Sequence, residues 1–418
     1  MSGNKELSDF AKEISECVKC GACQAHCPTY RQSRREGSVA RGKLALAGAV
    51  LNGSMELDEG VQKDIEMCLM CGSCVHKCPN KVPTHEIVGA LRRQLSRQRG
   101  LSPLGKGVGT VLGSRVLMKT LCKGSSLFMP LLLKKIPEAS GLRLRFPLAA
   151  MAKRTVPKIP FHNLFDLFPE FIPGRPDRPT IGFFAGCSLT YIYPKVGAAM
   201  IRLLKRLGYS IHLPRAQQCC GIPALSSGAG EVVETLAANN VAAFGKYGEK
   251  SIVTACASCL GGIGHYYRTM KSDYQDFTDK VVDFSVFLCR EGVVEELAAL
   301  PRWENRLRVT YHDPCHLKTQ GITREPRALL RALPNVELIE MEGADLCCGL
   351  GGTFSVSHYK ESQAIGAAKL PGIEASGAQK VVTACPGCII QLQDVINHAG
   401  LPVEAVHLLE LIEEALAR

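Results

Sequence analysis

Two short runs near the N-terminus each carry four cysteines with the same spacing, C-x2-C-x2-C-x3-C-P. The cysteines are, in chain order, Cys17, Cys20, Cys23 and Cys27, then Cys68, Cys71, Cys74 and Cys78. Thiolates at this spacing are typical ligands of bacterial-type [4Fe–4S] clusters. A zinc site would be expected to use two separated pairs instead. The two runs therefore predict two [4Fe–4S] clusters.

In two-cluster ferredoxins, the fourth cysteine of each run binds the other run's cluster, because the chain turns at the proline. The expected ligands of one cluster are Cys17, Cys20, Cys23 and Cys78. The expected ligands of the other are Cys68, Cys71, Cys74 and Cys27. His26 and His76 adjoin ligand positions, either as hydrogen-bond partners that tune a cluster or as polar residues at its rim.

Ten further cysteines form two quintets in the second half of the chain. The quintets are Cys187, Cys219, Cys220, Cys256 and Cys259, then Cys315, Cys347, Cys348, Cys385 and Cys388. Equivalent members lie 128 or 129 residues apart, and the segment IVTACASC at 252–259 returns as VVTACPGC at 381–388. This register indicates duplication of one domain.

Apolar runs at 180–186, 209–213 and 251–255 predict buried strands that end just before cysteines. Helical spacing of apolar residues predicts helices over 195–208 and 229–247. The second unit repeats the pattern, so both are expected to be α/β with parallel-sheet cores. Cysteines past the C-terminal ends of parallel strands occupy the edge where such sheets bind ligands.

Five thiolates in each unit exceed the four that an ordinary cubane takes. Three alternatives are open for each quintet: an unusual four-iron cluster that uses all five thiolates, a cubane with one spare thiol, or a zinc site. Iron–sulfur clusters are favoured over zinc. The sequence thus predicts one or two further clusters in this half of the chain.

The composition fits a globular, intracellular protein. Among 418 residues, 46% are hydrophobic and 21% charged, and no stretch of 18 uncharged apolar residues suggests a membrane span. The polar start of the chain shows no leader, so cytoplasmic thiols that act as ligands are expected rather than disulfides. We expect an α+β two-cluster ferredoxin-like domain at 1–100, with a helical insert over 38–51 and a helix over 84–98. A linker at 101–177 and duplicated units at 178–300 and 301–418 follow.

Basic residues concentrate between positions 92 and 158. This stretch holds fifteen Lys or Arg and one acid, Glu138, whereas the whole chain has a formal net charge of +11. Its basic residues alternate with Leu and Phe, which predicts a surface for an anionic membrane or an acidic partner. The alternative is a solvated linker. No nucleic-acid motif is present, so nucleic acid is not expected as a partner.

Several other residues are of types that could carry chemistry. His312 and His316 flank Cys315, the first cysteine of the second quintet. Each could donate a hydrogen bond to cluster sulfur, carry protons, or simply pack at the end of a strand. Cys122 and Cys289 receive no role. The glycines at 105–109 lack a preceding strand, so a phosphate-binding loop is rejected.

The quintet pattern C-x(31)-C-C-G-x(34–35)-C-x-x-C resembles the duplicated cysteine-rich CCG domain that one subunit of heterodisulfide reductase contains. That resemblance implies noncubane [4Fe–4S] clusters. A two-cluster ferredoxin followed by two CCG domains resembles the iron–sulfur subunits of glycolate oxidase, D-lactate dehydrogenase and anaerobic glycerol-3-phosphate dehydrogenase. The segments CVKCGACQAHCPTY at 17–30 and LCCGLGGTFSVSH at 346–358 look most similar to the glycolate and lactate type.

The resemblance implies an electron-transfer subunit. A separate flavoprotein would oxidise D-lactate or glycolate, and this chain would relay the electrons to quinone or another acceptor, at the inner face of the membrane if the basic stretch contacts lipid. No dinucleotide or flavin motif is recognisable, so no catalytic residue is assigned. The alternatives are a disulfide reductase of heterodisulfide-reductase type, the iron–sulfur subunit of an anaerobic glycerol-3-phosphate dehydrogenase, or a metal-stabilised interaction module.

Overall fold

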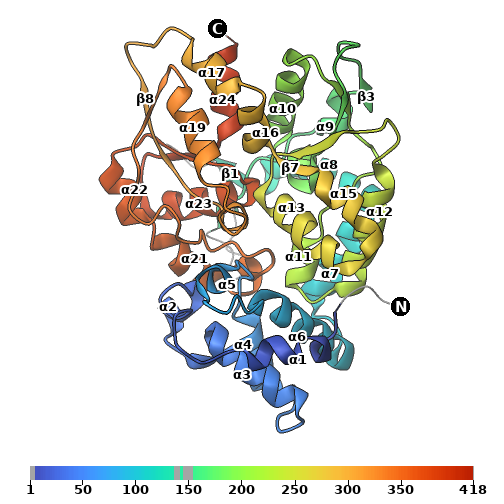
Figure 1. The fold of residues 1–418 in the computed structure, drawn as a ribbon. Helices are drawn as coiled ribbons and strands as arrows, with labels where there is room; N and C mark the ends of the chain where they lie inside the picture. Colours follow the sequence, from blue (N-terminus) through green and yellow to red (C-terminus); the bar gives the residue numbers. More distant parts are fainter. Residues whose placement is uncertain (1–4, 136–141, 145–153, 418) are drawn as a thin grey trace.

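The computed structural model describes residues 5–135, 142–144 and 154–417. A helical N-terminal part lies at the bottom of Figure 1, and two α/β units stand side by side above it. The first unit is coloured green to yellow and the second orange to red. Both units contact the N-terminal part, so all three meet near the centre of the molecule.

The N-terminal part is built from short helices and loops. Its helices are η1 Leu7–Phe10, α1 Ala11–Ser15, α2 Pro28–Ser33, η2 Glu36–Ser38, α3 Ala40–Leu51, α4 Glu59–Glu66, α5 Ser73–Lys77 and α6 Thr84–Arg99. Helices α3 and α6 confirm those expected over 38–51 and 84–98. Ile87 and Leu91 of α6 are fully buried in the core of this part.

The expectation of an α+β fold for the N-terminal domain is wrong. Between residues 5 and 132 the described chain contains helices and no strand. The long connection between the two cysteine runs folds as α3 and α4, whose Leu44, Ala47 and Ile65 help to form the local core. Helices therefore supply the apolar surface that strands would otherwise provide.

The segment expected to be a basic amphipathic linker forms helices that pack against the first α/β unit. Its elements are α7 Pro103–Gly113, α8 Arg115–Leu132, β1 Leu133–Lys135, β2 Leu142–Leu144 and α9 Leu164–Leu167. Ser102 and Ser114 cap α7 and α8 with their hydroxyls. A Cβ on Gly109 would lie 3.2 Å from Val232, so the glycines let α7 approach the first α/β unit closely. Residues 136–141 and 145–153 of the basic stretch lie outside the described residues.

The first α/β unit contains a five-stranded sheet in the order β3-β5-β4-β6-β7. The strands are β3 Phe171–Ile172, β4 Thr180–Phe184, β5 Ser210–His212, β6 Ser251–Thr254 and β7 Val281–Asp283. All neighbours are parallel except β3, which pairs antiparallel with β5. The helices are η3 Ser188–Ile192, α10 Pro194–Arg206, α11 Ile222–Ser226, α12 Gly230–Ala243, α13 Ala257–Gly261, η4 Gly262–Tyr267, α14 Arg268–Met270, η5 Ser272–Tyr274, α15 Gln275–Lys280, α16 Phe284–Arg290 and α17 Val293–Ala298.

The second α/β unit repeats this arrangement with a four-stranded, fully parallel sheet in the order β11-β10-β8-β9. The strands are β8 Leu307–Tyr311, β9 Val336–Leu338, β10 Lys380–Thr383 and β11 Glu404–His407. The helices are α18 Cys315–Lys318, α19 Arg324–Ala332, α20 Phe354–Ser357, α21 Tyr359–Ala367, α22 Leu370–Ser376, α23 Pro386–Ala399 and α24 Leu408–Leu416. Strands β5-β4-β6-β7 thus correspond to β9-β8-β10-β11, which confirms the expected duplication and parallel-sheet cores.

The two units pack through equivalent elements. Helix α10 of the first contacts α24 of the second, and α16 contacts α19; likewise α13 contacts α18, and η3 contacts α23. Helix α19 is the repeat equivalent of α10, and α24 is that of α16, so each contact occurs twice with the two units interchanged. A pseudo-twofold axis between the units produces this pattern. Near it, the amide of Ala257 donates to the carbonyl of Ala384 at 3.2 Å. One hydrophobic core runs through both units, so they are expected to fold as a single body.

A buried acid at the end of β7 makes the stability of this core depend on pH. Asp283 accepts hydrogen bonds from the backbone and hydroxyl of Ser285, and its second carboxylate oxygen has no partner. Burial raises the pKa of Asp283 to about 7. The folded pKa exceeds the unfolded value, so the stability that the protonated acid contributes is complete below about pH 4 and is lost as the pH rises through 7.

We therefore expect the Asp283→Asn variant to be stabilised relative to the natural chain as the pH increases. Between pH 5 and 8 the gap in unfolding free energy should widen by about 2–3 kcal/mol. Anaerobic urea denaturation at several pH values measures the gap. Asp273→Asn, at an exposed position, should show no such trend, and a gap independent of pH would contradict the prediction.

Candidate metal centres

The first group of cysteines surrounds a cavity beside α1 and α5. The cavity is lined by Cys17, Cys20, Cys23, Cys74 and Cys78. Three of the thiols come from the loop after α1, where Gly21 takes a left-handed φ of 84°. Cys78 follows α5 and belongs to the second run. The structure thus brings the fourth cysteine of the second run to the first three of the other run, as the crossover predicts.

The second group surrounds a neighbouring cavity lined by Cys27, Cys68, Cys71 and Cys74. The hydroxyl of Thr29 lies 3.1 Å from the sulfur of Cys27. The amide of Met70 donates to Cys68 at 3.4 Å. The partners expected for the second cluster are therefore together. Cys74 lines both cavities, so the two groups are adjacent.

The first quintet forms a connected row of sulfur atoms past the strand ends of the first unit. Cys187 and Cys219 lie 3.5 Å apart. Contacts between side chains continue from Cys219 to Cys220, then to Cys259 and Cys256. All five predicted positions are therefore brought together.

The second quintet lines a cavity past the strand ends of the second unit. Its wall contains Cys315, Cys347, Cys348, Cys385 and Cys388. The sulfur atoms of Cys348 and Cys388 lie 3.5 Å apart. The side chain of Cys347 contacts those of Cys315 and Cys348, and the side chain of Cys388 contacts that of Cys385. Both quintets are thus complete as spatial groups.

The glycine after each Cys-Cys pair has a geometric reason. Gly221 and Gly349 take φ values of 91° and 95°, where side chains are disfavoured. Their amides donate to the sulfurs of Cys219 and Cys347 at 3.5 and 3.4 Å. A Cβ on Gly349 would lie 2.5 Å from the carbonyl oxygen of Ser362. Glycine lets the chain fold back onto its own thiol.

Two contacts join groups that no spacing in the sequence connects. The side chain of Cys256 contacts its repeat equivalent Cys385 across the pseudo-twofold axis. The side chain of Cys71, from the N-terminal part, contacts Cys347. All ten quintet cysteines therefore form one continuous network, and it extends into the second N-terminal group. Sequence reasoning did not predict either contact.

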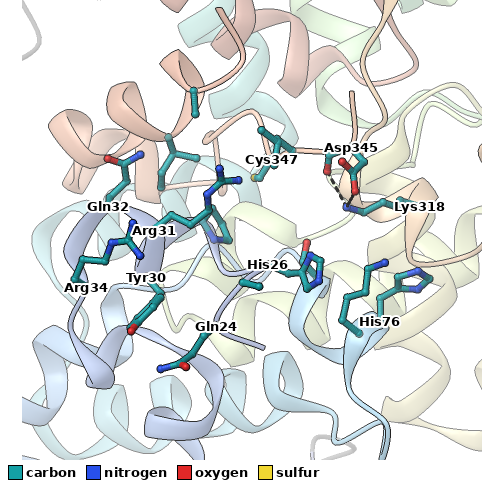
Figure 2. Close-up of a pocket in the computed structure, with 17 residues that line it drawn as sticks. Gln24, His26, Tyr30, Arg31, Gln32, Arg34, His76, Lys318, Asp345 and Cys347 are labelled. Carbon is teal, nitrogen blue, oxygen red and sulfur yellow. Dashed lines mark hydrogen bonds and ion pairs between the residues drawn. The ribbon is translucent and has the colours of Figure 1, made fainter. Parts of the chain in front are cut away.

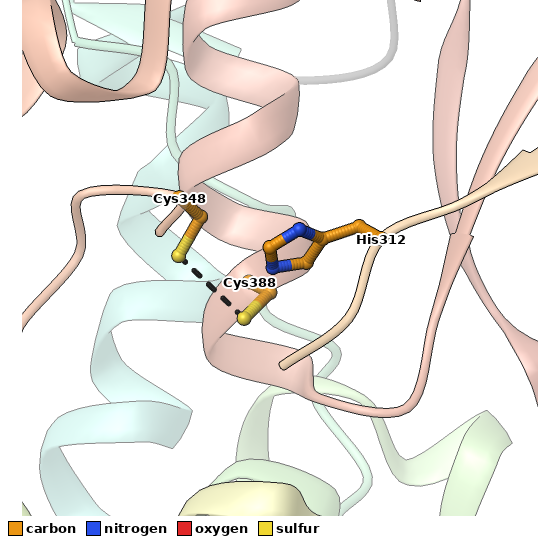
Figure 3. Close-up of side chains that lie close together, drawn as sticks. All are labelled: His312, Cys348 and Cys388. Carbon is orange, nitrogen blue, oxygen red and sulfur yellow. Dashed lines mark hydrogen bonds between the residues drawn. The ribbon is translucent and has the colours of Figure 1, made fainter. Parts of the chain in front are cut away.

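Histidines supply further polar groups at the second quintet. Figure 3 shows the ring of His312 pointing toward the sulfurs of Cys348 and Cys388. Burial lowers the pKa of His312, which favours the neutral imidazole, and the ring contacts the side chain of Cys348. His316 lines the same cavity. Of the roles that the sequence leaves open for His312, contact with the sulfur ligands matches its position.

Buried lysines place positive charge near the thiols. Lys43 lines the second N-terminal cavity and donates to the carbonyl of Gly37 at 2.9 Å. Lys369 is fully buried near the second quintet, where burial lowers its pKa to about 8. It donates to the carbonyls of Gly343, Ala344 and Leu346. Their charges favour an anionic group in these sites.

The donor set fits iron–sulfur clusters. All twenty cysteines are free thiols. Burial raises the pKa of Cys74, as desolvation disfavours a lone buried thiolate. Several thiolates can share such a space only when bound metal ions compensate their charge. Sets of four or five thiols with amide donors match iron–sulfur chemistry.

The remaining candidates have other neighbours. The sulfur of Cys122 is 4.0 Å from that of Met118 in α8, and Cys289 contacts the carbonyl of Glu325 at 3.7 Å. His26 and His76 are exposed at the wall of a larger cavity that Cys347 also lines. Their position matches the rim alternative.

Comparisons with known proteins agree with this geometry. Residues 13–82 match the 4Fe-4S dicluster domain family, and residues 181–264 and 309–393 match the cysteine-rich CCG domain family. The chain is 30% identical to the probable glycolate oxidase iron–sulfur subunit of Bacillus subtilis (strain 168), covering 99% of each chain. It is 27% identical to the glycolate oxidase iron–sulfur subunit of Escherichia coli (strain K12), covering 100% of this chain and 98% of that one.

A heterodisulfide reductase relative matches over a similar length. One subunit of the dihydromethanophenazine:CoB–CoM heterodisulfide reductase of Methanosarcina barkeri (strain Fusaro) is 26% identical, covering 97% of this chain and 94% of that one. The cysteine pattern, the duplicated α/β units and the full-length likeness agree. The chain is an iron–sulfur protein and belongs to the family of the glycolate oxidase iron–sulfur subunits.

Proposed function

We propose that this chain is the electron-transfer subunit of a flavin-dependent 2-hydroxy-acid dehydrogenase. A separate flavoprotein subunit oxidises D-lactate or glycolate, and this chain relays the electrons toward quinone or another acceptor. The observation that carries the proposal is the continuous sulfur network from Cys71 through both quintets. Such a path suits transfer of electrons through the protein better than chemistry at one isolated centre.

The eighteen predicted cysteines would hold the clusters. The N-terminal groups would hold two [4Fe–4S] clusters with crossed ligands, and each quintet would hold one further cluster. When bound, these groups supply one-electron transfer. The chain's own residues exclude water by burial, donate amide hydrogens to sulfur and place Lys43 and Lys369 near the negative charge. These are the means by which a protein sets cluster potential.

Anaerobic preparation and metal analysis test the cluster proposal. We expect about sixteen irons per chain, four for each of four clusters, and negligible zinc. About eight irons with zinc present would limit the clusters to the N-terminal part. A folded, colourless and iron-free protein would contradict the proposal entirely.

Substrate-dependent reduction tests the role in electron transfer. The chain is co-expressed with a candidate flavoprotein, and visible absorbance and EPR are followed after D-lactate or glycolate is added. We expect reduction of the iron–sulfur signals only when the flavoprotein is present. Signals that the chemical reductant dithionite changes but no hydroxy acid does would exclude these substrates.

A disulfide reductase is the second candidate function. The contact between Cys256 and Cys385 places the two quintets side by side, which would allow both to act on one sulfur-containing substrate. Thiol release from a disulfide, with a reduced dye as the donor and no flavoprotein, would favour this alternative. Absence of turnover under those conditions favours the relay.

The exposed side of α8 is proposed as a peripheral contact with anionic lipid. Val116, Leu127 and Phe128 are 77%, 67% and 56% exposed. Lys119 and Lys123 lie on the same helix and share the single acid Asp166, at 3.8 and 3.4 Å, which leaves a net positive charge among these three side chains. Apolar side chains flanked by lysines match the interfacial and charged layers of an anionic membrane. Among the described residues, no helix has the length and apolar character needed to cross a bilayer.

We expect the chain to sediment with vesicles that contain anionic phospholipid and not with neutral ones. Changing Leu127 and Phe128 together to glutamate should weaken binding at least about tenfold, because two apolar anchors are lost and two charges added. Met55→Glu, at an exposed apolar position in the N-terminal part, is the matched control. Equal sedimentation of natural and double-variant chains would refute the contact.

A further inference from the structure

A large cavity lies between the N-terminal part and the second α/β unit, and it adjoins the cavity of the second quintet at Cys347. Its volume is about 610 Å³. Residues from α2 and the preceding loop form one wall, and α18 and the loop before Cys347 form another. Figure 2 shows Arg31 and Arg34 on one side, Lys318 on the other and Cys347 between them. This volume is within the range of sites that bind small molecules.

The cavity wall has a clear excess of positive charge. In the described part of the chain, the side chains of Arg31, Arg34 and Lys77 have no ion-pair partner within 4 Å. Lys318 pairs with Asp345 at 3.5 Å, and Asp345 is the only acid in the described wall. Three unpaired cations therefore face a solvent-accessible space. Arginine side chains bind carboxylates and phosphates through paired hydrogen bonds.

Compensation of cluster charge is a less satisfactory explanation of these cations. Lys43 and Lys369 are buried beside the thiols and are placed for that role. Arg31, Arg34 and Lys77 are instead exposed, so water screens their effect on a buried cluster. They remain available to a ligand that enters the cavity from solvent.

We propose that this cavity binds a small organic anion with at least two negative groups, carboxylates or phosphates, beside Cys347. The three unpaired cations match a polyanion better than the single charge of a 2-hydroxy acid. The site is therefore distinct from the substrate site expected on the flavoprotein. Its occupant could act as a redox-active ligand or as an effector, and both share the same recognition chemistry.

Binding at this place should be coupled to the redox state of the second quintet. This coupling rests on the proposed function, whereas binding itself does not. A negative ligand beside Cys347 favours the less negative, oxidised state of a neighbouring cluster. By linkage, the oxidised protein should bind the anion more tightly than the reduced protein. The ligand would therefore lower the reduction potential of that cluster.

Equilibrium dialysis with the cluster-loaded full chain tests binding. The probes are citrate, pyrophosphate and glycolate at matched ionic strength. We expect citrate or pyrophosphate to bind at least tenfold more tightly than glycolate, and the better probe distinguishes carboxylate from phosphate recognition. Similar weak binding of all three would overturn the proposal, because it would show non-specific attraction to a basic surface.

Variants connect the binding to this cavity. The double variant Arg31→Gln and Arg34→Gln should lose at least tenfold in affinity, with iron content and EPR signals unchanged. Arg35→Gln is the control, because Arg35 directly follows Arg34, pairs with Asp64 and does not line the cavity. Unchanged affinity in the double variant would overturn the site.

Potentiometric titration with and without the better probe tests the coupling. A fall in potential that disappears in the double variant supports it, and a potential insensitive to bound anion refutes the coupling while leaving the site. If iron analysis shows no cluster in the second unit, the proposed role of the second quintet in electron transfer is wrong, and the coupling fails with it. The dialysis result still decides the anion site.

Discussion

Replacing Cys27 with serine is expected to damage the cluster of the second cysteine run, although Cys27 belongs to the first. Its thiol lines a cavity with Cys68, Cys71 and Cys74, and not with the other cysteines of its own run. Loss of one thiolate should convert a [4Fe–4S] cluster toward a three-iron form. EPR should show a three-iron signal, and iron should fall by about one per chain.

The same change should block electron transfer between the N-terminal part and the quintets. The second N-terminal group is the one whose Cys71 contacts Cys347, so its integrity determines the connection. Reduction of the iron–sulfur clusters by the flavoprotein and their re-oxidation by an acceptor can be followed separately. We expect transfer across this junction to slow by orders of magnitude.

Two matched variants make the result decisive. Cys78→Ser should produce the corresponding damage in the other N-terminal cluster, because Cys78 lines the cavity with Cys17 and Cys20. Cys289→Ser, outside every cysteine group, should leave iron and EPR unchanged. If Cys27→Ser instead altered the signal that Cys17→Ser alters, the crossed arrangement would be wrong.

Cysteine spacing and apolar runs were sufficient to predict most of the two α/β units. Strands β4, β6 and β10 end shortly before Cys187, Cys256 and Cys385, as the apolar runs indicate. Helices α10 and α12 match those expected over 195–208 and 229–247. These features are local or repeated, and local patterns are what a single sequence encodes most directly.

Features that depend on packing between distant segments could not be predicted. The Cys71–Cys347 and Cys256–Cys385 contacts depend on how three parts of the chain dock, which no spacing specifies. From the sequence, the glycines of α7 received no role beyond a rejected phosphate-binding loop, whereas Gly109 permits close packing against Val232. The strand content expected near the N-terminus was inferred from the cysteine motif alone, and helices of the long connection replaced it.

Arg92 of α6 ties the parts together, and its loss is the second large effect we expect. Its buried guanidinium donates to the carbonyls of Ile65, Glu66 and Cys68, and to that of Ser226 in the first α/β unit. The hydroxyl of Ser226 in turn lies 2.8 Å from that of Thr353 in the second unit. One side chain therefore connects a predicted cluster ligand to the joint between the two units.

The variant Arg92→Met keeps much of the buried volume and removes every one of these hydrogen bonds. Because several buried carbonyls lose a charged donor, we expect a loss of about 3 kcal/mol or more in unfolding free energy. Anaerobic urea denaturation measures it, and EPR should show earlier loss of the cluster next to Cys68 than of the one next to Cys17.

Arg97→Met is the matched control on the same helix. Arg97 pairs with Glu6 at 2.8 Å, but both side chains are substantially exposed, so the cost should stay within about 0.5 kcal/mol. Equal losses in the two variants would mean that the buried junction contributes no more than a surface ion pair. A large loss confined to Arg92→Met would instead show that docking of the N-terminal part and retention of its inner cluster depend on the same residue. That dependence is expected if the sulfur network functions only when all three parts are assembled.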